Sequence, residues 1–166
     1  MHPWLRCLLA ATIACVASAS MAGPPRLLRG TITHVTDGDS VWLRPASGGA
    51  PQPVRLRGID APEICQAHGQ AARQALLSRV MAQRVVVRVR GRDKYERLLG
   101  ELTTQDLPDV GAWMVATGHA WASGGRGRGV YAQAQDRARN DGIGLWSQGH
   151  AVEPRAFRRR FGSCHG

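Results

Sequence analysis

The 166-residue sequence has little lysine and little negative charge: Lys94 is its only lysine, and 12 acidic residues face 22 basic ones. It lacks an uncharged apolar run of about 18 residues, which excludes a transmembrane helix. It also lacks Cys-x-x-Cys and His-x₃-His pairs, a nucleotide-binding glycine loop and a serine or cysteine nucleophile motif. With 43 % hydrophobic residues and no internal repeat, we expect one compact domain.

Arginine is what the sequence has in excess, and it brings the net charge to +10. A guanidinium group is a planar fork that binds phosphate through two N–H groups. The charge therefore favours a polyanionic partner, although a genome rich in arginine codons would give the same composition. Residues 155–161 combine arginines with aromatic rings, a pattern typical of nucleic-acid binding or of a solvated tail.

Residues 1–22 have the pattern of a secretory signal. Arg6 precedes the apolar residues 7–17, and small residues precede possible cleavage sites after Ala19 and Ala22. We expect cleavage after Ala22, followed by a linker over residues 23–29. The protein would then be exported, to the periplasm or outside the cell.

Export would change the set of cysteines, because Cys7 and Cys15 lie within the signal. The mature chain would keep Cys65 and Cys164, an even pair in an oxidising compartment. A disulfide between them would close a long loop and stabilise the fold by roughly 4–5 kcal/mol. Two free thiols are the alternative.

Alternation of apolar and polar residues predicts five short strands, at residues 27–35, 41–44, 54–57, 84–90 and 97–102. Helices are expected over residues 64–82, 109–117 and 131–140. This order predicts an α+β, mainly β fold: a five-stranded OB-fold barrel with about three helices packed on it. An open α+β sheet is the alternative.

Four carboxylates cluster near the ends of predicted strands: Asp37, Asp39, Asp60 and Glu63. If strand pairing brings Asp39 and Asp60 together, they make an oxygen site for a divalent cation, and calcium fits because it also accepts waters and carbonyls. Taken alone, the sequence at 37–39 is more typical of an ordinary hairpin turn. Glu63 opens the predicted helix, where it suits the helix dipole, and could also take a proton from an attacking water.

Two arginines complete this set. Arg55 lies on the strand that leads to Asp60, and Arg97 follows Asp93-Lys94-Tyr95. Taken singly, each is typical of a protein surface. Taken together with a cation and a carboxylate, they would stabilise the negative charge that gathers on phosphate oxygens during phosphoryl transfer.

Three motifs, at residues 35–41, 55–63 and 93–97, occur in an order and spacing that resemble the thermonuclease (staphylococcal nuclease-like) family. Residues 118–121 and 144–146 resemble its later landmarks. The resemblance covers residues 30–147 as a nuclease domain and leaves residues 148–166 as a basic C-terminal tail. It implies an OB-fold endonuclease that hydrolyses DNA and RNA with calcium, cleaves the bond from phosphorus to the 5′ oxygen and leaves 3′-phosphate ends.

The resemblance also implies a role for each matching residue. Asp39 and Asp60 would hold calcium by side chain and Ser40 by its backbone carbonyl, Arg55 and Arg97 would bind phosphate, Glu63 would be the general base, and Lys94 and Tyr95 would bind the nucleotide. We expect a monomer that favours single-stranded or locally unpaired nucleic acid. The alternatives are a catalytically silent nucleic-acid-binding OB module and a small disulfide-tied periplasmic interaction protein.

Three departures from the family pattern stand out. Glu96 replaces the usual glycine before Arg97, so a positive φ there would strain the turn and misplace the arginine. Gln135 replaces an acidic residue of the last family helix, which suggests a structural difference. Residues 123–129, rich in glycine and arginine, stand where base-stacking tyrosines are expected, so substrate affinity or base preference would differ.

Overall fold

The computed structural model describes residues 26–124 and 129–164, so the predicted signal lies outside the described residues. The strands are β1 (Arg26–Val35), β2 (Ser40–Pro45), β3 (Gln52–Leu56), β4 (Ile59–Asp60), β5 (Arg84–Arg92), β6 (Leu98–Thr104) and β7 (Trp121–Ala122). The helices are α1 (Gly69–Val80), α2 (Val110–Ala116), α3 (Ala132–Asn140) and α4 (Pro154–Phe161), with a 3₁₀ turn η2 (Gly144–Trp146).

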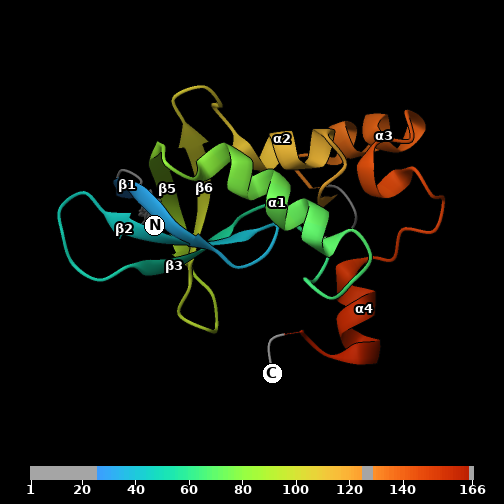
Figure 1. Cartoon of the computed structure of the whole chain (residues 1–166), viewed down its shortest axis with the longest axis horizontal. Coiled ribbons are helices and arrows are strands. Elements are labelled where there is room, and N and C mark those ends of the chain that lie inside the picture. Colours follow the sequence, from blue (N-terminus) through green and yellow to red (C-terminus); the bar gives the residue numbers. More distant parts are fainter. Residues whose placement is uncertain (1–25, 125–128, 165–166) are drawn as a thin grey trace, which may run out of the picture.

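Five strands close into a barrel in the order β1-β2-β3-β6-β5 (Figure 1). All neighbouring strands are antiparallel except β3 and β6, which run parallel. Apolar side chains on alternate positions, such as Leu43, Val54 and Val87, fill the interior and are fully buried. The predicted five-stranded OB-fold barrel is therefore confirmed, and the open sheet is excluded.

Three helices gather beside the barrel (Figure 1). Helix α1 packs against β1 and α2, and α2 packs in turn against β6 and α3. The predicted stripe of α1 is correct, because Ala72, Leu76 and Val80 are fully buried. Among the described residues no helix is both long and apolar enough to cross a membrane.

Helix α1 is shorter than the predicted 64–82. His68, just before it, has a φ of 68°, which a continuing helix does not allow. The chain makes two tight turns here, with the amide of Gln66 bonded to the carbonyl of Glu63 at 2.8 Å. Gly69 passes so close to the same carbonyl that no Cβ would fit. This packing fixes the segment after Glu63 as a turn.

Two segments outside the predicted domain 30–147 have regular structure. Residues 26–29, assigned to a linker, pair with β5 from Arg26 opposite Val89 to Arg29 opposite Val86. The predicted tail contains a fourth helix, α4, which begins with proline at its first turn. A disulfide joins Cys65 to Cys164, with Cα atoms 5.8 Å apart, and ties the chain after α4 to the segment after Glu63.

The turn between β5 and β6 carries the predicted strain. Glu96 has a φ of 61°, in the left-handed region that side chains with a Cβ avoid. Asp93 nevertheless orders the turn: its Oδ1 atom accepts from the amides of Tyr95 (2.9 Å) and Arg97 (3.1 Å). The predicted misplacement of the Arg97 backbone is thus opposed by the Asp93 side chain.

Replacing Glu96 with glycine should stabilise the protein by up to about 1 kcal/mol. The variant removes a left-handed cost of roughly 1–2 kcal/mol and adds the smaller entropic cost of glycine, about 0.5–1 kcal/mol. Glu96→Ala is the matched control, because it removes the same charge but keeps the Cβ. Urea unfolding measures the free energy of unfolding of both variants. Equal stability of the two variants would show that charge, and not backbone strain, is the feature that matters.

Candidate active site

Asp39 lies in the turn between β1 and β2, with its side chain 2 % exposed. Gly38 lets this turn pack tightly, because a Cβ there would lie 2.7 Å from the Cβ of Ala61 and 2.8 Å from that of Ala72. The buried carboxylate accepts from the Ala61 amide and from the Ser40 hydroxyl, each at 2.8 Å. Its position is therefore set by the backbone around it.

Arg55 brings Asp39 and Asp60 together. The Nη1 atom of Arg55, on β3, bonds Oδ1 of Asp39, and Nη2 donates to Oδ1 of Asp60 at 2.7 Å. Asp60 is fixed in turn because β4 pairs with β7, where Asp60 lies opposite Trp121. The two carboxylates thus share one guanidinium group, which is the proximity expected from the sequence.

Burial of this carboxylate pair makes a positive charge beside it favourable. It raises the pKa of Asp39 to about 6, against the lowering effect of the Arg55 charge. Burial opposes the charged form of Arg55 too, but Asp39 and Asp60 raise the pKa of its guanidinium, so it stays charged. Asp39, Asp60 and the neighbouring Glu63 share two arginines, Arg55 and Arg158 of α4, so one negative charge would be balanced by a further cation.

The donor atoms fit a hard divalent cation such as calcium, because both carboxylates supply oxygen. The described part of the chain holds no group of three His, Cys, Asp or Glu side chains able to bind a metal. Further ligands would therefore be backbone carbonyls or waters. The carbonyl of Ser40 already accepts the Thr36 amide at 2.9 Å, and it is the hydroxyl that reaches Asp39. The carbonyl role of Ser40 stays a prediction.

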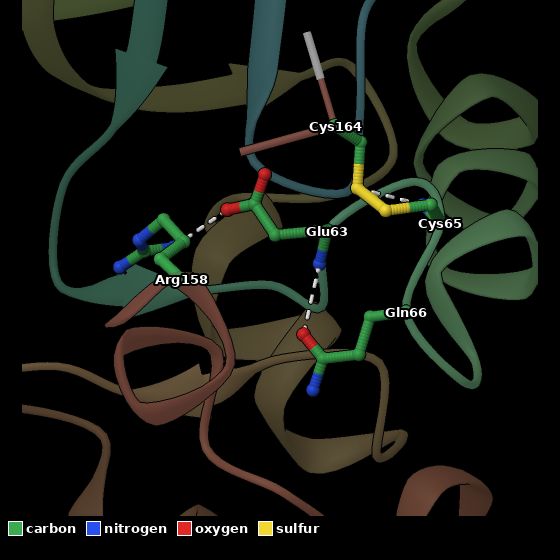
Figure 2. The surroundings of a disulfide bond; sticks show 5 residues. All are labelled: Glu63, Cys65, Gln66, Arg158 and Cys164. Carbon is green, nitrogen blue, oxygen red and sulfur yellow. Dashed lines mark hydrogen bonds and ion pairs between the residues drawn. A yellow bond between two sulfur atoms is a disulfide. The ribbon is translucent and has the colours of Figure 1, made fainter. Parts of the chain in front are cut away.

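Glu63 lies beside this pair, with its side chain 11 % exposed. Its amide donates to Oε1 of Gln66 at 3.2 Å, and Gln66 also donates to the Val152 carbonyl at 2.6 Å. The carboxylate of Glu63 accepts from Nη1 of Arg158 at 2.8 Å (Figure 2). The residue predicted as general base is therefore held at its backbone by Gln66 and at its carboxylate by Arg158.

Arg158 is the site residue that the sequence analysis missed. It projects from α4 and contacts Asp60 twice, with Nη1 3.1 Å from Oδ1 and Nη2 2.9 Å from Oδ2. Residues 155–161 were expected to bind nucleic acid or to form a solvated tail, and nothing in that run singles out one arginine. The available signal was the Cys65–Cys164 pair, which returns the tail to the region after Glu63.

Arg97 is not part of the carboxylate network among the described residues, since its guanidinium pairs with Asp93 at 2.8 Å. Its position is nevertheless close to Arg55 along the sheet. Leu99 is the register partner of Arg55 across the parallel β3–β6 pair, and Arg97 lies two positions before Leu99. Arg55 lies between the buried Val54 and Leu56 and so points out of the barrel, and Arg97 lies in the turn directly before β6.

The two predicted nucleotide-binding residues lie in the same turn as Arg97. Tyr95 is 66 % exposed. Its ring centroid is 4.9 Å from Nζ of Lys94 and 5.5 Å from the Arg97 guanidinium carbon. An exposed aromatic ring with two cations near it is suited to a nucleotide.

The glycine- and arginine-rich residues 123–129, the third departure from the family pattern, fall partly outside the described residues, which omit 125–128. Tyr131, just beyond, donates its hydroxyl to the Asp109 carboxylate at 2.9 Å. Gln135 accepts from the Ala122 amide at 2.8 Å and so supports β7. These contacts give both residues a structural role.

Comparisons with known proteins agree with this geometry. The profile of the family described as Staphylococcal nuclease homologue matches residues 53–148. Micrococcal nuclease of Shigella flexneri is 34 % identical over 166 residues, covering 93 % of this chain and 92 % of its own length. Protein ParB of Escherichia coli is 38 % identical over 171 residues, covering 95 % of this chain and 92 % of its own length.

A third relative, an uncharacterized endonuclease of Haemophilus influenzae, is 35 % identical over 130 residues, which are 78 % of this chain and 72 % of its own length. The profile match spans more than half of the chain and contains the segment from Arg55 to Glu63. Asp39 precedes the matched range. The alignments with protein ParB and with micrococcal nuclease cover 95 % and 93 % of this chain, however, and so extend over Asp39. This chain belongs to the staphylococcal nuclease family.

Proposed function

We propose that this protein is an exported, calcium-dependent endonuclease that hydrolyses phosphodiester bonds of DNA and RNA and leaves 3′-phosphate ends. The observation that carries the proposal is the meeting of Asp39 and Asp60 on Arg55, with Glu63 joined to Asp60 through Arg158. Relatives named as a micrococcal nuclease and as an endonuclease support the reaction class.

The proposed reaction uses water as the nucleophile. Glu63 takes one proton from this water, whose oxygen forms the new bond to phosphorus while the bond from phosphorus to the 5′ oxygen breaks. The leaving 5′ oxygen takes a proton from solvent. Calcium bound to Asp39 and Asp60 would supply positive charge that polarises the phosphate.

The two arginines would stabilise the charge on the non-bridging oxygens. For Arg55 this requires a change of partner, since its guanidinium now bonds Asp39 and Asp60. A cation that satisfies these carboxylates would free Arg55 for the phosphate. Arg97 lies in the turn before β6, the strand that pairs with β3, and its guanidinium is held by the carboxylate of Asp93.

Several features support the substrate and the compartment. The net charge of +10 and the exposed ring of Tyr95 suit a single-stranded or locally unpaired nucleic acid. We propose that the protein binds it as a monomer. The Cys65–Cys164 disulfide suits an oxidising compartment, as the predicted signal requires. The second candidate is a catalytically silent nucleic-acid-binding module, which the ion pairs of Arg158 with Glu63 and Asp60 favour.

The first test is incubation with single- and double-stranded DNA and with RNA, in calcium and in calcium plus excess chelator. We expect cleavage in calcium only, with single-stranded substrates cut faster. End analysis should find phosphate on the 3′ side of each cut. Binding without cleavage in every condition would favour the silent module, and cleavage that survives the chelator would contradict the calcium assignment.

Glu63→Gln should lower turnover about 100-fold or more, because glutamine keeps the shape but cannot accept the proton. Nucleic-acid binding should survive. Glu153→Gln is the matched control, since Glu153 is exposed and lies outside the site. The measurement is the single-turnover cleavage rate in saturating calcium. A variant as fast as the parent protein would show that Glu63 is not the base.

The Glu63→Gln variant also allows binding to be measured without cleavage. Its affinity for single-stranded DNA should fall as salt rises, with a log–log slope of about −0.7 for each phosphate contact. Fluorescence anisotropy over a range of salt concentrations gives the slope. An affinity that does not depend on salt would exclude a surface that binds the phosphate backbone.

A further inference from the structure

The guanidinium group of Arg158 occupies the carboxylate to which the proposed function assigns calcium. Both oxygens of Asp60 are engaged: Oδ1 by Arg55 at 2.7 Å and Arg158 at 3.1 Å, and Oδ2 by Arg158 at 2.9 Å. The same Arg158 group bonds Glu63 at 2.8 Å. Its side chain is 33 % exposed, whereas those of Asp60 and Glu63 are 12 % and 11 % exposed. The ion pairs of Arg158 are thus partly shielded from water, and charge-assisted hydrogen bonds are stronger in such a shielded place than in water.

Helix α4, which carries Arg158, is loosely packed on the rest of the protein. Within α4 only Pro154 is buried. A pocket of about 450 Å³ lies beside it, lined among others by Pro62, Leu145 and Phe157. Figure 1 shows α4 apart from the other three helices. Apolar packing therefore does little to hold Arg158 in the site.

The disulfide supplies the attachment that packing does not. Cys164 lies three positions after the end of α4, and Cys65 lies two positions after Glu63. Figure 2 shows the disulfide on one side of Glu63 and Arg158 on the other. A covalent link this short keeps a group near its partner at a high effective concentration. The link and the ion pairs thus hold the same two segments together.

We propose that Arg158 is a positioning residue that competes with the divalent cation for Asp60, and that the Cys65–Cys164 disulfide maintains this competition. The cation must displace a two-pronged ion pair, so the oxidised protein binds it weakly. Once displaced, Arg158 no longer restrains Glu63, and arrival of the cation releases the base. The identity of the cation rests on the proposed function.

The test is calorimetric titration of the oxidised protein with calcium alone, without nucleic acid. Arg158→Gln should tighten calcium binding by about fivefold or more, the range of a typical coupling between two sites. Arg159→Gln is the matched control, because it removes the same charge from an exposed position of the same helix, and its affinity should stay within about twofold of the parent. Unchanged or weaker binding in Arg158→Gln would overturn the proposal.

Arg158→Lys separates contact from net charge. Lysine keeps the charge but cannot bond Asp60 twice and Glu63 at once, so it should also tighten calcium binding. An affinity equal to that of the parent would mean that long-range charge alone acts, and would overturn the proposal.

A double-mutant cycle tests the disulfide. Replacing both Cys65 and Cys164 with serine should tighten calcium binding in the protein that retains Arg158, and should add little to Arg158→Gln, because both changes remove one competitor. Fully additive effects would overturn the role of the disulfide. If the serine variant unfolds, the lysine and glutamine variants decide the competition.

These titrations also separate this inference from the proposed function. Tighter calcium binding in Arg158→Gln without any cleavage of nucleic acid would support the competition and contradict the nuclease. Calcium-dependent cleavage with an unchanged calcium affinity in Arg158→Gln would support the nuclease and contradict the competition.

Discussion

The structure depends on one electrostatic constraint: two buried carboxylates, Asp39 and Asp60, need positive charge close to them. In this structure Arg55 and Arg158 supply it, and both are bound to Asp60. Leaving such a carboxylate buried and unpaired would be costly, as the raised pKa of Asp39 shows. In the proposed function a divalent cation would meet the same constraint, because it would balance the carboxylates and free the guanidinium groups for phosphate.

The barrel is what makes this arrangement rigid. Asp39 is fixed by the tight turn at Gly38, Arg55 by its place on β3, and Asp60 by the pairing of β4 with β7. Glu63 is held by the turn that precedes α1. By contrast, Arg158 comes from a helix attached by a disulfide and by its own ion pairs, with only Pro154 of the helix buried, so the site combines a fixed set of carboxylates with one guanidinium group on a less firmly packed element.

The sequence predicted most of the barrel, because alternating valines such as Val85 and Val87 must face a core. Motif spacing also predicted the meeting of Asp39, Asp60 and Arg55. Three features were beyond sequence reasoning. The positive φ of His68 belongs to a turn in which the next residue, Gly69, packs against the Glu63 carbonyl. Strands β4 and β7 are too short to show alternation, and one arginine among several on α4 is selected only by the path of the folded chain.

The central claim is that Asp39 and Asp60 together hold one divalent cation beside Arg55 and Glu63. A crystal structure of the protein with calcium and a short phosphorothioate oligonucleotide tests it most directly. The account predicts calcium bonded to both carboxylates, Arg55 and Arg97 on a phosphate, and Arg158 displaced from Asp60. Calcium bound elsewhere, with Asp60 still paired to Arg158 and the phosphate away from Arg55, would contradict it.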